Sequence, residues 1–253
     1  MGTIVVTGAA SGIGAATRER LEADGHRSIG VDRHEADVVA DLGSPEGRRI
    51  AIDKIRAASN GILDGVVSAA GLGPYDDPQA VTRVNYFGAV AMLDELRPLL
   101  AAGSAPAAVA ISSVGAVFTA LVIPAYLEAC LAGDEARAQA EIAGKDGNTA
   151  YVNAKHALAL AVRARASDWG AAGIRLNAVA PGSTETPMLD RLHQDSELGP
   201  AVRGLPMPLG RTAQPRELAN AIAFLLGPDA SYVHGTVLFV DGGSDAAVRP
   251  DAL

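Results

Sequence analysis

The chain has 253 residues, a hydrophobic content of 49% and a formal net charge of -8. This length and apolar content suit one large domain over residues 1–253 with a buried core. The acidic balance argues against nucleic acid or an anionic membrane as a partner, since both bind clustered Lys and Arg. Cys130 is a single cysteine and cannot form an internal disulfide, and no basic, apolar signal segment precedes Thr3. We therefore expect a cytoplasmic location.

Short apolar and β-branched runs recur along the chain, with helical patterns between most of them. We expect strands at 3–7, 27–31, 38–40, 65–68, 107–112, 175–180 and 237–240. Strands separated by helices favour right-handed βαβ units and a parallel sheet. The sequence therefore predicts an α/β fold with a single doubly wound parallel sheet, whose ligands bind beyond the carboxyl ends of the strands.

The first strand runs into a glycine-rich turn, Gly8-Ala9-Ala10-Ser11-Gly12-Ile13-Gly14, and a helical pattern follows at once. Glycines let the backbone approach a pyrophosphate, and the first amides of the helix point at it. The G-x-x-x-G-x-G spacing differs from the commoner G-x-G-x-x-G fingerprint, so a purely structural turn remains an alternative.

Asp32 follows the second predicted strand, where an acidic group would meet the adenosine ribose of a dinucleotide. Its carboxylate can accept hydrogen bonds from a ribose diol and would repel a 2'-phosphate. This favours NAD(H) as the cofactor. Arg33 could accommodate a phosphate, so NADP(H) stays open as the alternative.

The uncharged stretch between Arg97 and Glu128 is interrupted by glycine, proline and serine, so we interpret it as a buried strand with its flanks, not as a membrane span. Farther on, Tyr151 and Lys155 stand four residues apart in a helical pattern and share one face. A nearby positive charge favours the phenolate and brings the phenol toward the range of acid/base catalysis. Two polar residues at the edge of an amphipathic helix would show the same spacing.

These motifs resemble the short-chain dehydrogenase/reductase family over essentially the whole chain, because further motifs fall in the same order. They are Asp41-Leu42, Ala69-Ala70-Gly71, Val84-Asn85-Tyr86-Phe87-Gly88, Ile111-Ser112-Ser113 and Pro181-Gly182-Ser183-Thr184-Glu185-Thr186. The resemblance implies a Rossmann-type fold. It also implies that the cofactor is held by Gly8, Ser11, Gly12, Ile13, Gly14, Asp32, Arg33, Asp41, Leu42, Ala69, Ala70, Gly71, Tyr151, Lys155, Pro181, Gly182, Thr184 and Thr186. Ala69 stands where many relatives carry asparagine, so only its backbone is left for that contact.

By the same resemblance the catalytic residues are Asn85, Ser113, Tyr151 and Lys155. Tyr151 would exchange a proton with the substrate hydroxyl, and Ser113 would hydrogen-bond and orient the same oxygen. Lys155 would lower the pKa of Tyr151 and hold the nicotinamide ribose. Asn85 would hold a water in a proton path.

The interval between Ser113 and Tyr151 is longer than the family pattern. Tyr126 lies at the usual distance from Ser113, but Cys130 stands four residues after it and carries no positive charge. We therefore assign the catalytic role to Tyr151 and interpret residues 115–148 as an insert. Its pattern predicts two short helices, at 125–132 and 134–143, with Asp134 as an N-cap.

An apolar stripe runs along this insert through Leu127, Cys130, Leu131 and Ile142. The stripe fits simple packing onto the domain. Alternatively, the insert lies beside the Tyr151 helix, which in many relatives forms a subunit interface, and so changes which faces associate. We expect a homodimer or a homotetramer.

Within the family, the insert and three phrases resemble the bacterial 3α-hydroxysteroid dehydrogenase/carbonyl reductase branch. The phrases are Gly71-Leu72-Gly73-Pro74, Val84-Asn85-Tyr86-Phe87-Gly88 and Ser231-Tyr232-Val233-His234-Gly235. This implies oxidation of a steroid secondary alcohol, or reduction of a ketone or aldehyde, with a small apolar substrate as the partner. A related enzyme for another alcohol, a sugar or an acyl substrate is one alternative. A cofactor-binding sensor without chemistry is another, although it would not need Ser113 or Asn85.

The segment after Gly182 predicts either an apolar lid over the nicotinamide or ordinary loop packing. Its apolar residues are Met188, Leu189, Leu192, Leu198, Leu205, Met207 and Leu209. The five histidines form no cluster at metal-ligand spacing, so we expect no metal, and we expect His156 at the surface.

Overall fold

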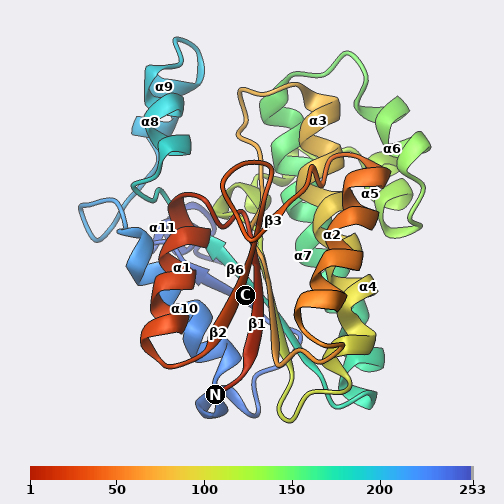
Figure 1. Cartoon of the computed structure of the whole chain (residues 1–253). Helices are drawn as coiled ribbons and strands as arrows, with labels where there is room; N and C mark the ends of the chain where they lie inside the picture. The colour runs from red at the N-terminus through yellow and green to blue at the C-terminus, as the bar shows by residue number, and fades with distance from the viewer. Residues whose placement is uncertain (252–253) are drawn as a thin grey trace.

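A seven-stranded parallel sheet forms the middle layer of the computed structural model, which describes residues 1–251 (Figure 1). Its strands lie in the order β3-β2-β1-β4-β5-β6-β7. Their bounds are β1 (Thr3–Thr7), β2 (Arg27–Asp32), β3 (Val38–Val39), β4 (Gly65–Ser68), β5 (Ala107–Ile111), β6 (Arg175–Pro181) and β7 (Val237–Val240). The seven predicted strands and the doubly wound fold class are confirmed, with differences of one residue at some ends.

Helices cover both faces of this sheet (Figure 1). On one face α1 (Gly12–Ala23) packs against α10 (Pro215–Leu226), and on the other α4 (Ala89–Leu100) lies between α2 (Pro45–Ala58) and α7 (Gly147–Ala171). Successive side chains of β1 point to opposite faces of the sheet, as in any β-strand. Val5 belongs to the core under α2, α4 and α7, whereas Ile4 and Val6 belong to the core under α1 and α10.

Strand β1 marks the point where the strand order reverses. It pairs with β2 on one side and with β4 on the other, and Thr7 is in register with both Val31 and Ser68. The carboxyl ends of the three strands are therefore level. In a doubly wound sheet the crevice outside these ends is where ligands bind.

The helix after β4 contains an unexpected π-helical turn. α3 (Pro78–Thr82) begins with Asp77 as its cap, since the Ala80 amide donates to Asp77 Oδ2 at 2.7 Å. It continues directly into a π-helix, η1 (Arg83–Gly88), and then into α4. The helical patterns expected between the strands gave no sign of this π-turn. π-turns are rare and are often found at functional sites.

The predicted insert forms two short 3₁₀ turns followed by two helices. These are η2 (Val114–Val117), η3 (Thr119–Leu121), α5 (Pro124–Leu131) and α6 (Glu135–Ile142). The two helices are confirmed, and Asp134 caps α6 by accepting from the Arg137 amide at 2.9 Å. α5 packs against α7 and α6 packs against α3. Leu131 does not join the apolar stripe, because 47% of it is exposed.

The remaining helices lie after β6. α8 (Pro187–Gln194) and α9 (Leu198–Arg203) rise above the carboxyl edge of the sheet (Figure 1). The short elements η4 (Pro228–Ala230) and α11 (Ser244–Val248) flank β7 in the chain. In residues 1–251, none of the helices combines the length and the apolar character needed to cross a membrane.

Candidate functional site

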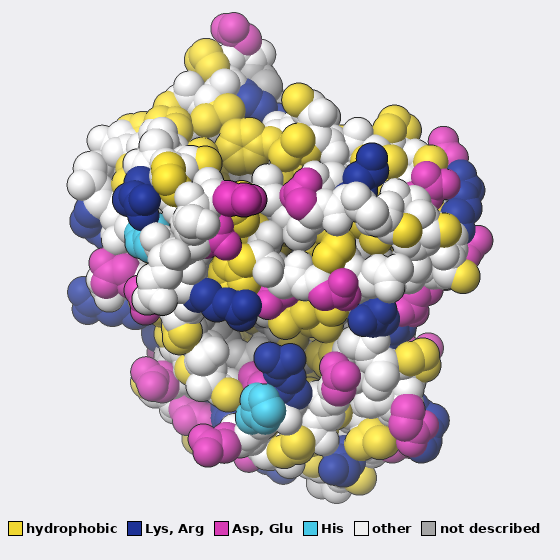
Figure 2. Space-filling model, turned by 90° about the horizontal axis from the view of Figure 1, so that it is seen from above, with side chains coloured by type: hydrophobic (Ala, Val, Ile, Leu, Met, Phe, Trp, Pro, Cys, Tyr) yellow, Lys and Arg dark blue, Asp and Glu magenta, His cyan; other side chains and the backbone are white. Residues whose placement is uncertain are grey.

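A cavity of about 810 Å³ lies at the carboxyl edge of the sheet. Every residue predicted to contact the cofactor, from Gly8 to Thr186, lines it. Figure 2 looks down on this edge of the molecule and shows apolar side chains in its central hollow, with charged groups around them. The structure thus brings together motifs that are scattered along the chain.

The glycine-rich turn shapes one end of the cavity. Gly8 and Gly12 adopt left-handed backbone angles, with φ of 67° and 56°. A Cβ on Gly14 would lie 2.0 Å from the Gly8 carbonyl oxygen, so only glycine permits this close turn. Ser11 precedes α1 without a side-chain hydrogen bond to the helix amides. The start of α1 is therefore a cradle that fits a pyrophosphate.

Asp32 is held at the end of β2 by backbone amides. Its Oδ2 accepts from the Ala10 amide at 3.1 Å, and its Oδ1 accepts from the Arg33 amide at 2.7 Å. The Arg33 side chain is exposed. Beside this carboxylate, the cavity is lined by Val31, Ala40, Leu42 and Val84. This apolar slot next to a fixed carboxylate fits an adenine and its ribose diol.

Ser113 and Tyr151 meet at the cavity wall from two elements. Ser113 follows β5, and its Oγ accepts from the Gly115 amide at 3.0 Å. Tyr151 lies in the second turn of α7. A Cβ on Gly115 would lie 3.3 Å from Ser113 Oγ and 3.6 Å from Tyr151 Cε1, so both side chains border the same glycine.

The ionisation of Tyr151 and Lys155 is dominated by burial. Burial raises the pKa of Tyr151, and a hydrogen bond with Ser113 acts in the opposite direction. Lys155 lies one turn later, and burial lowers its pKa to about 8. Its Nζ donates to the Ile111 carbonyl oxygen at 2.7 Å and lies 5.9 Å from the centroid of the Tyr151 ring. In the protein alone, the net shift of the Tyr151 pKa is thus opposite to the one predicted from the Lys155 charge.

Asn85 is fully buried and binds the loop after β4. Its Oδ1 accepts from the Leu72 amide at 2.7 Å, and its Nδ2 donates to the Leu72 carbonyl oxygen at 3.0 Å. Unlike the other three predicted catalytic residues, it is not among the described residues that line the cavity. A Cβ on Gly71 would lie 3.3 Å from Asn85 Oδ1 and 3.6 Å from Lys155 Nζ. Asn85 therefore fixes the loop that separates it from the cavity.

Tyr126 lies outside the cavity, within the packing of the insert. It is fully buried, and its hydroxyl donates to Thr82 Oγ1 at 3.2 Å. Burial raises its pKa. Of the two tyrosines in question, the structure places only Tyr151 at the cavity wall.

Apolar side chains line the end of the cavity beyond Tyr151. The segment after Gly182 supplies five of the expected residues, Met188, Leu189, Leu192, Leu198 and Leu205. Met207 and Leu209 do not line the cavity, and Leu209 is 69% exposed. Other walls were not expected: they are Leu72, Pro74, Phe118, Leu121, Asn148, Val152, Ala201 and Val202. No sequence signal marks them, because they lie in loops or 3₁₀ turns or on helix faces with other predicted roles.

The first helix of this segment is tied to the loop after β4. The Arg191 guanidinium lies 4.0 Å from the centroid of the Tyr75 ring, and its Nη1 is 3.2 Å from Asp76 Oδ1. The Tyr75 hydroxyl donates to the Met188 carbonyl oxygen at 3.4 Å. These contacts hold α8 across the cavity.

His156 contributes to packing in this structure. His156 is half-buried, and its Nδ1 lies 2.7 Å from the Ala116 carbonyl oxygen, so it links α7 to η2 and is not the surface residue that we expected. Within residues 1–251 there is no group of three or more His, Cys, Asp or Glu that could hold a metal ion.

Known proteins are similar to this chain in sequence and in fold. Residues 2–130 match the family model "short chain dehydrogenase", and residues 136–245 match "Enoyl-(Acyl carrier protein) reductase". The chain is 48% identical to the 3-alpha-hydroxysteroid dehydrogenase/carbonyl reductase of Comamonas testosteroni, over 99% of both chains. It is 34% identical to cis-4-hydroxycyclohexanecarboxylate dehydrogenase of Sinomonas cyclohexanicum, over 96% of both.

A solved structure is also close to this one. The 3-alpha-hydroxysteroid dehydrogenase from Pseudomonas sp. B-0831, crystallised in complex with NADH, has a TM-score of 0.96. It is 46% identical, and the match covers 99% of this chain and 100% of the other. The chain therefore belongs to the short-chain dehydrogenase/reductase family, whose enzymes exchange a hydride between a nicotinamide cofactor and an alcohol or carbonyl.

Proposed function

We propose that the protein is an NAD(H)-dependent enzyme that interconverts 3α-hydroxysteroids and 3-ketosteroids and also reduces other apolar carbonyl compounds. The observation that carries this proposal is the apolar end of the cavity beyond Tyr151. Its walls come from the loop after β4, from the insert and from α8 and α9. A steroid would bury its apolar rings there while presenting one oxygen to Ser113 and Tyr151.

NAD(H) as the preferred cofactor rests on Asp32. Its carboxylate, held by backbone amides, would accept hydrogen bonds from a ribose diol and would repel a phosphate at the same position. The amides at the start of α1 would bind the pyrophosphate, and Lys155 would hold the nicotinamide ribose. When bound, the nicotinamide accepts or supplies the hydride.

Tyr151 is the proposed acid and base. In the oxidation it would take the proton of the substrate hydroxyl, and in the reduction it would return one to the carbonyl oxygen. Ser113 would hydrogen-bond the same oxygen and orient it. Because burial raises the pKa of Tyr151, the proton-accepting form is favoured by alkaline pH and the proton-donating form by neutral pH. Asn85 would act indirectly. It would hold the Leu72 backbone in place and would bind the water of the expected proton path.

The test follows nicotinamide absorbance with NAD or NADP as the cofactor. The substrates are a 3α-hydroxysteroid, its 3β epimer and small secondary alcohols. Turnover of the 3α epimer with NAD is the expected result. Turnover of small alcohols alone would keep the family and refute the steroid substrate, and cofactor binding without any turnover would favour a sensor.

We also propose that the protein is a homodimer or homotetramer in the cytoplasm. The single cysteine, Cys130, is buried and suits a reducing compartment. Because α5 covers part of α7, association should use other faces of the molecule. Analytical ultracentrifugation gives the oligomer size, and an intersubunit bundle built on α7 in a crystal structure would refute this arrangement.

A further inference from the structure

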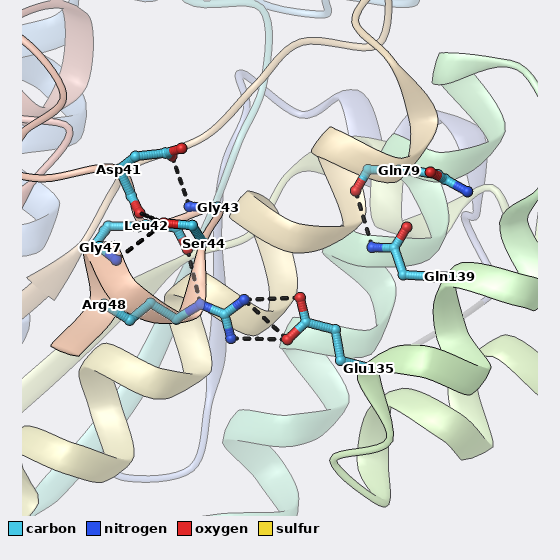
Figure 3. A network of polar contacts seen from close by, with 9 residues as sticks. All are labelled: Asp41, Leu42, Gly43, Ser44, Gly47, Arg48, Gln79, Glu135 and Gln139. Carbon is cyan, nitrogen blue, oxygen red and sulfur yellow. Dashed lines mark hydrogen bonds and ion pairs between the residues drawn. The ribbon is translucent and has the colours of Figure 1, made fainter.

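An ion pair joins the insert to the helix that follows the adenine slot (Figure 3). Arg48 Nη1 donates to Glu135 Oε2 at 2.9 Å, and Arg48 Nη2 donates to Glu135 Oε1 at 2.8 Å. The side chains are only 12% and 28% exposed. A two-pronged, largely buried pair of this kind fixes the position of both groups.

The same guanidinium also holds the loop that carries Asp41 and Leu42. Arg48 Nε donates to the Leu42 carbonyl oxygen at 3.0 Å (Figure 3). Next to it, Asp41 Oδ1 accepts from the Gly43 amide at 2.9 Å, and Ser44 Oγ accepts from the Gly47 amide at 3.0 Å. The loop is therefore closed by local contacts, and Arg48 connects its backbone to the insert.

A second contact joins the insert to the opposite wall of the slot. Gln139 Nε2 donates to the Gln79 carbonyl oxygen at 3.1 Å, so α6 is bound to α3 (Figure 3). α3 continues into the π-helix that carries Val84, and Val84 and Leu42 both line the slot. One helix of the insert thus contacts the elements that hold both walls.

We propose that Glu135 is a positioning residue for cofactor binding: through Arg48 it fixes the Asp41–Leu42 loop against the adenine. The insert therefore contributes to cofactor affinity from outside the cavity. This inference rests on the proposed function only in requiring a dinucleotide in the cavity, and not on the identity of the substrate.

Removal of the Glu135 charge leaves a largely buried guanidinium without its counter-ion. Arg48 would then turn toward solvent and release the Leu42 carbonyl oxygen. The loop becomes more mobile, so binding of the adenine end weakens, whereas Tyr151 and Ser113 stay in place. The expected pattern is weaker cofactor binding with an unchanged turnover number.

The experiment compares Glu135→Gln with Glu128→Gln in the full-length protein. Glu128 lies in the same insert and pairs with Arg137 at 3.0 Å, and both side chains are exposed. Glu128→Gln therefore makes the same change of charge as Glu135→Gln, but at a residue that does not contact Arg48. AMP serves as the adenine probe, and its dissociation constant and that of NADH are measured by titration. KM for NAD and kcat are measured with the best alcohol substrate, and the unfolding midpoint checks folding.

Glu135→Gln is expected to weaken AMP and NADH binding and to raise KM for NAD by about three- to tenfold, with kcat within twofold. Glu128→Gln should bind both ligands like the wild type. Arg48→Lys keeps a charge near Glu135 but loses the fork, so it should weaken AMP binding as Glu135→Gln does.

Unchanged AMP binding in both Glu135→Gln and Arg48→Lys would overturn the proposal. A loss of kcat with normal AMP binding would overturn it as well. Steroid turnover by the wild type reports separately on the proposed function, so the failure of one idea does not decide the other.

Discussion

At the scale of single residues, the choice between two tyrosines decides the chemistry. Tyr151→Phe removes the proposed acid and base and should lower kcat by about 10²- to 10⁴-fold, because the proton transfer is lost. NADH binding should remain. Tyr126→Phe removes only the hydrogen bond to Thr82 and should stay active, with about 1 kcal/mol less stability. Steady-state rates, NADH titration and urea unfolding check the pair, and an active Tyr151→Phe would reverse the assignment.

Asp32 is the residue on which cofactor choice is predicted to depend. Asp32→Ala removes the carboxylate that repels a 2'-phosphate and should raise KM for NAD about tenfold or more while NADP becomes a better substrate. Arg33 then becomes the group that attracts the phosphate. The double variant Asp32→Ala/Arg33→Ala should lose the gain with NADP. Specificity constants for both cofactors test this, and an unchanged ratio in Asp32→Ala would show that Asp32 does not discriminate.

The site residues that could be predicted lie in short motifs, where backbone geometry or ligand chemistry requires a particular residue type. Gly8 and Gly12 lie in the turn after β1, where the backbone needs left-handed angles, and Asp32 ends β2 with a carboxylate for a ribose. The structure places all three at the cavity. The contact of Asn85 with Leu72 could not be predicted, because it depends on how a distant loop folds back. The shift of the Tyr151 pKa could not be predicted either, since burial is a property of the folded chain.

At the scale of elements, α8 and α9 form the apolar cover of the site. Leu192 lines the cavity, so Leu192→Ala should raise KM for a steroid severalfold and change KM for a small carbonyl little, because only the larger substrate reaches this wall. Leu209→Ala is the matched control, since Leu209 is exposed and outside the cavity. Equal effects of Leu192→Ala on KM for both substrates would contradict the idea that α8 and α9 contact the steroid.

The strands could be predicted because each is a short run of apolar and β-branched residues. The insert helices could be predicted because apolar residues recur along them and a cap residue, Asp134, precedes α6. The elements that the sequence did not reveal have no such marks. The π-turn of Arg83–Gly88 reads as a continuous helix, and the 3₁₀ turns that bring Phe118 and Leu121 to the cavity lie in an uncharged stretch without period. No local residue pattern distinguishes these conformations from an ordinary helix or loop.

At the scale of the whole molecule, stability is predicted to depend on pH through Lys155. Its pKa is about 8 in the folded protein and 10.5 ordinarily. Between these values the unfolded chain holds one more proton, so stability rises with pH across this window, by about 3 kcal/mol in total. Lys155→Met lacks this effect. From pH 8 to 10, urea unfolding should show the stability of the wild type rising relative to that of Lys155→Met. A constant difference in stability would contradict the lowered pKa of Lys155 in the folded protein.

The position of β1 between β2 and β4 has a consequence for the order of folding events. The cavity takes its walls from the Gly8 turn, from the loops after β4 and β5 and from the segment that follows β6, so its parts are distant along the chain. A ribosome must release nearly all of the polypeptide before these parts can meet. Such long-range, parallel pairings form slowly. During refolding, helical signal should therefore return before enzymatic activity, and activity reports the last step of assembly.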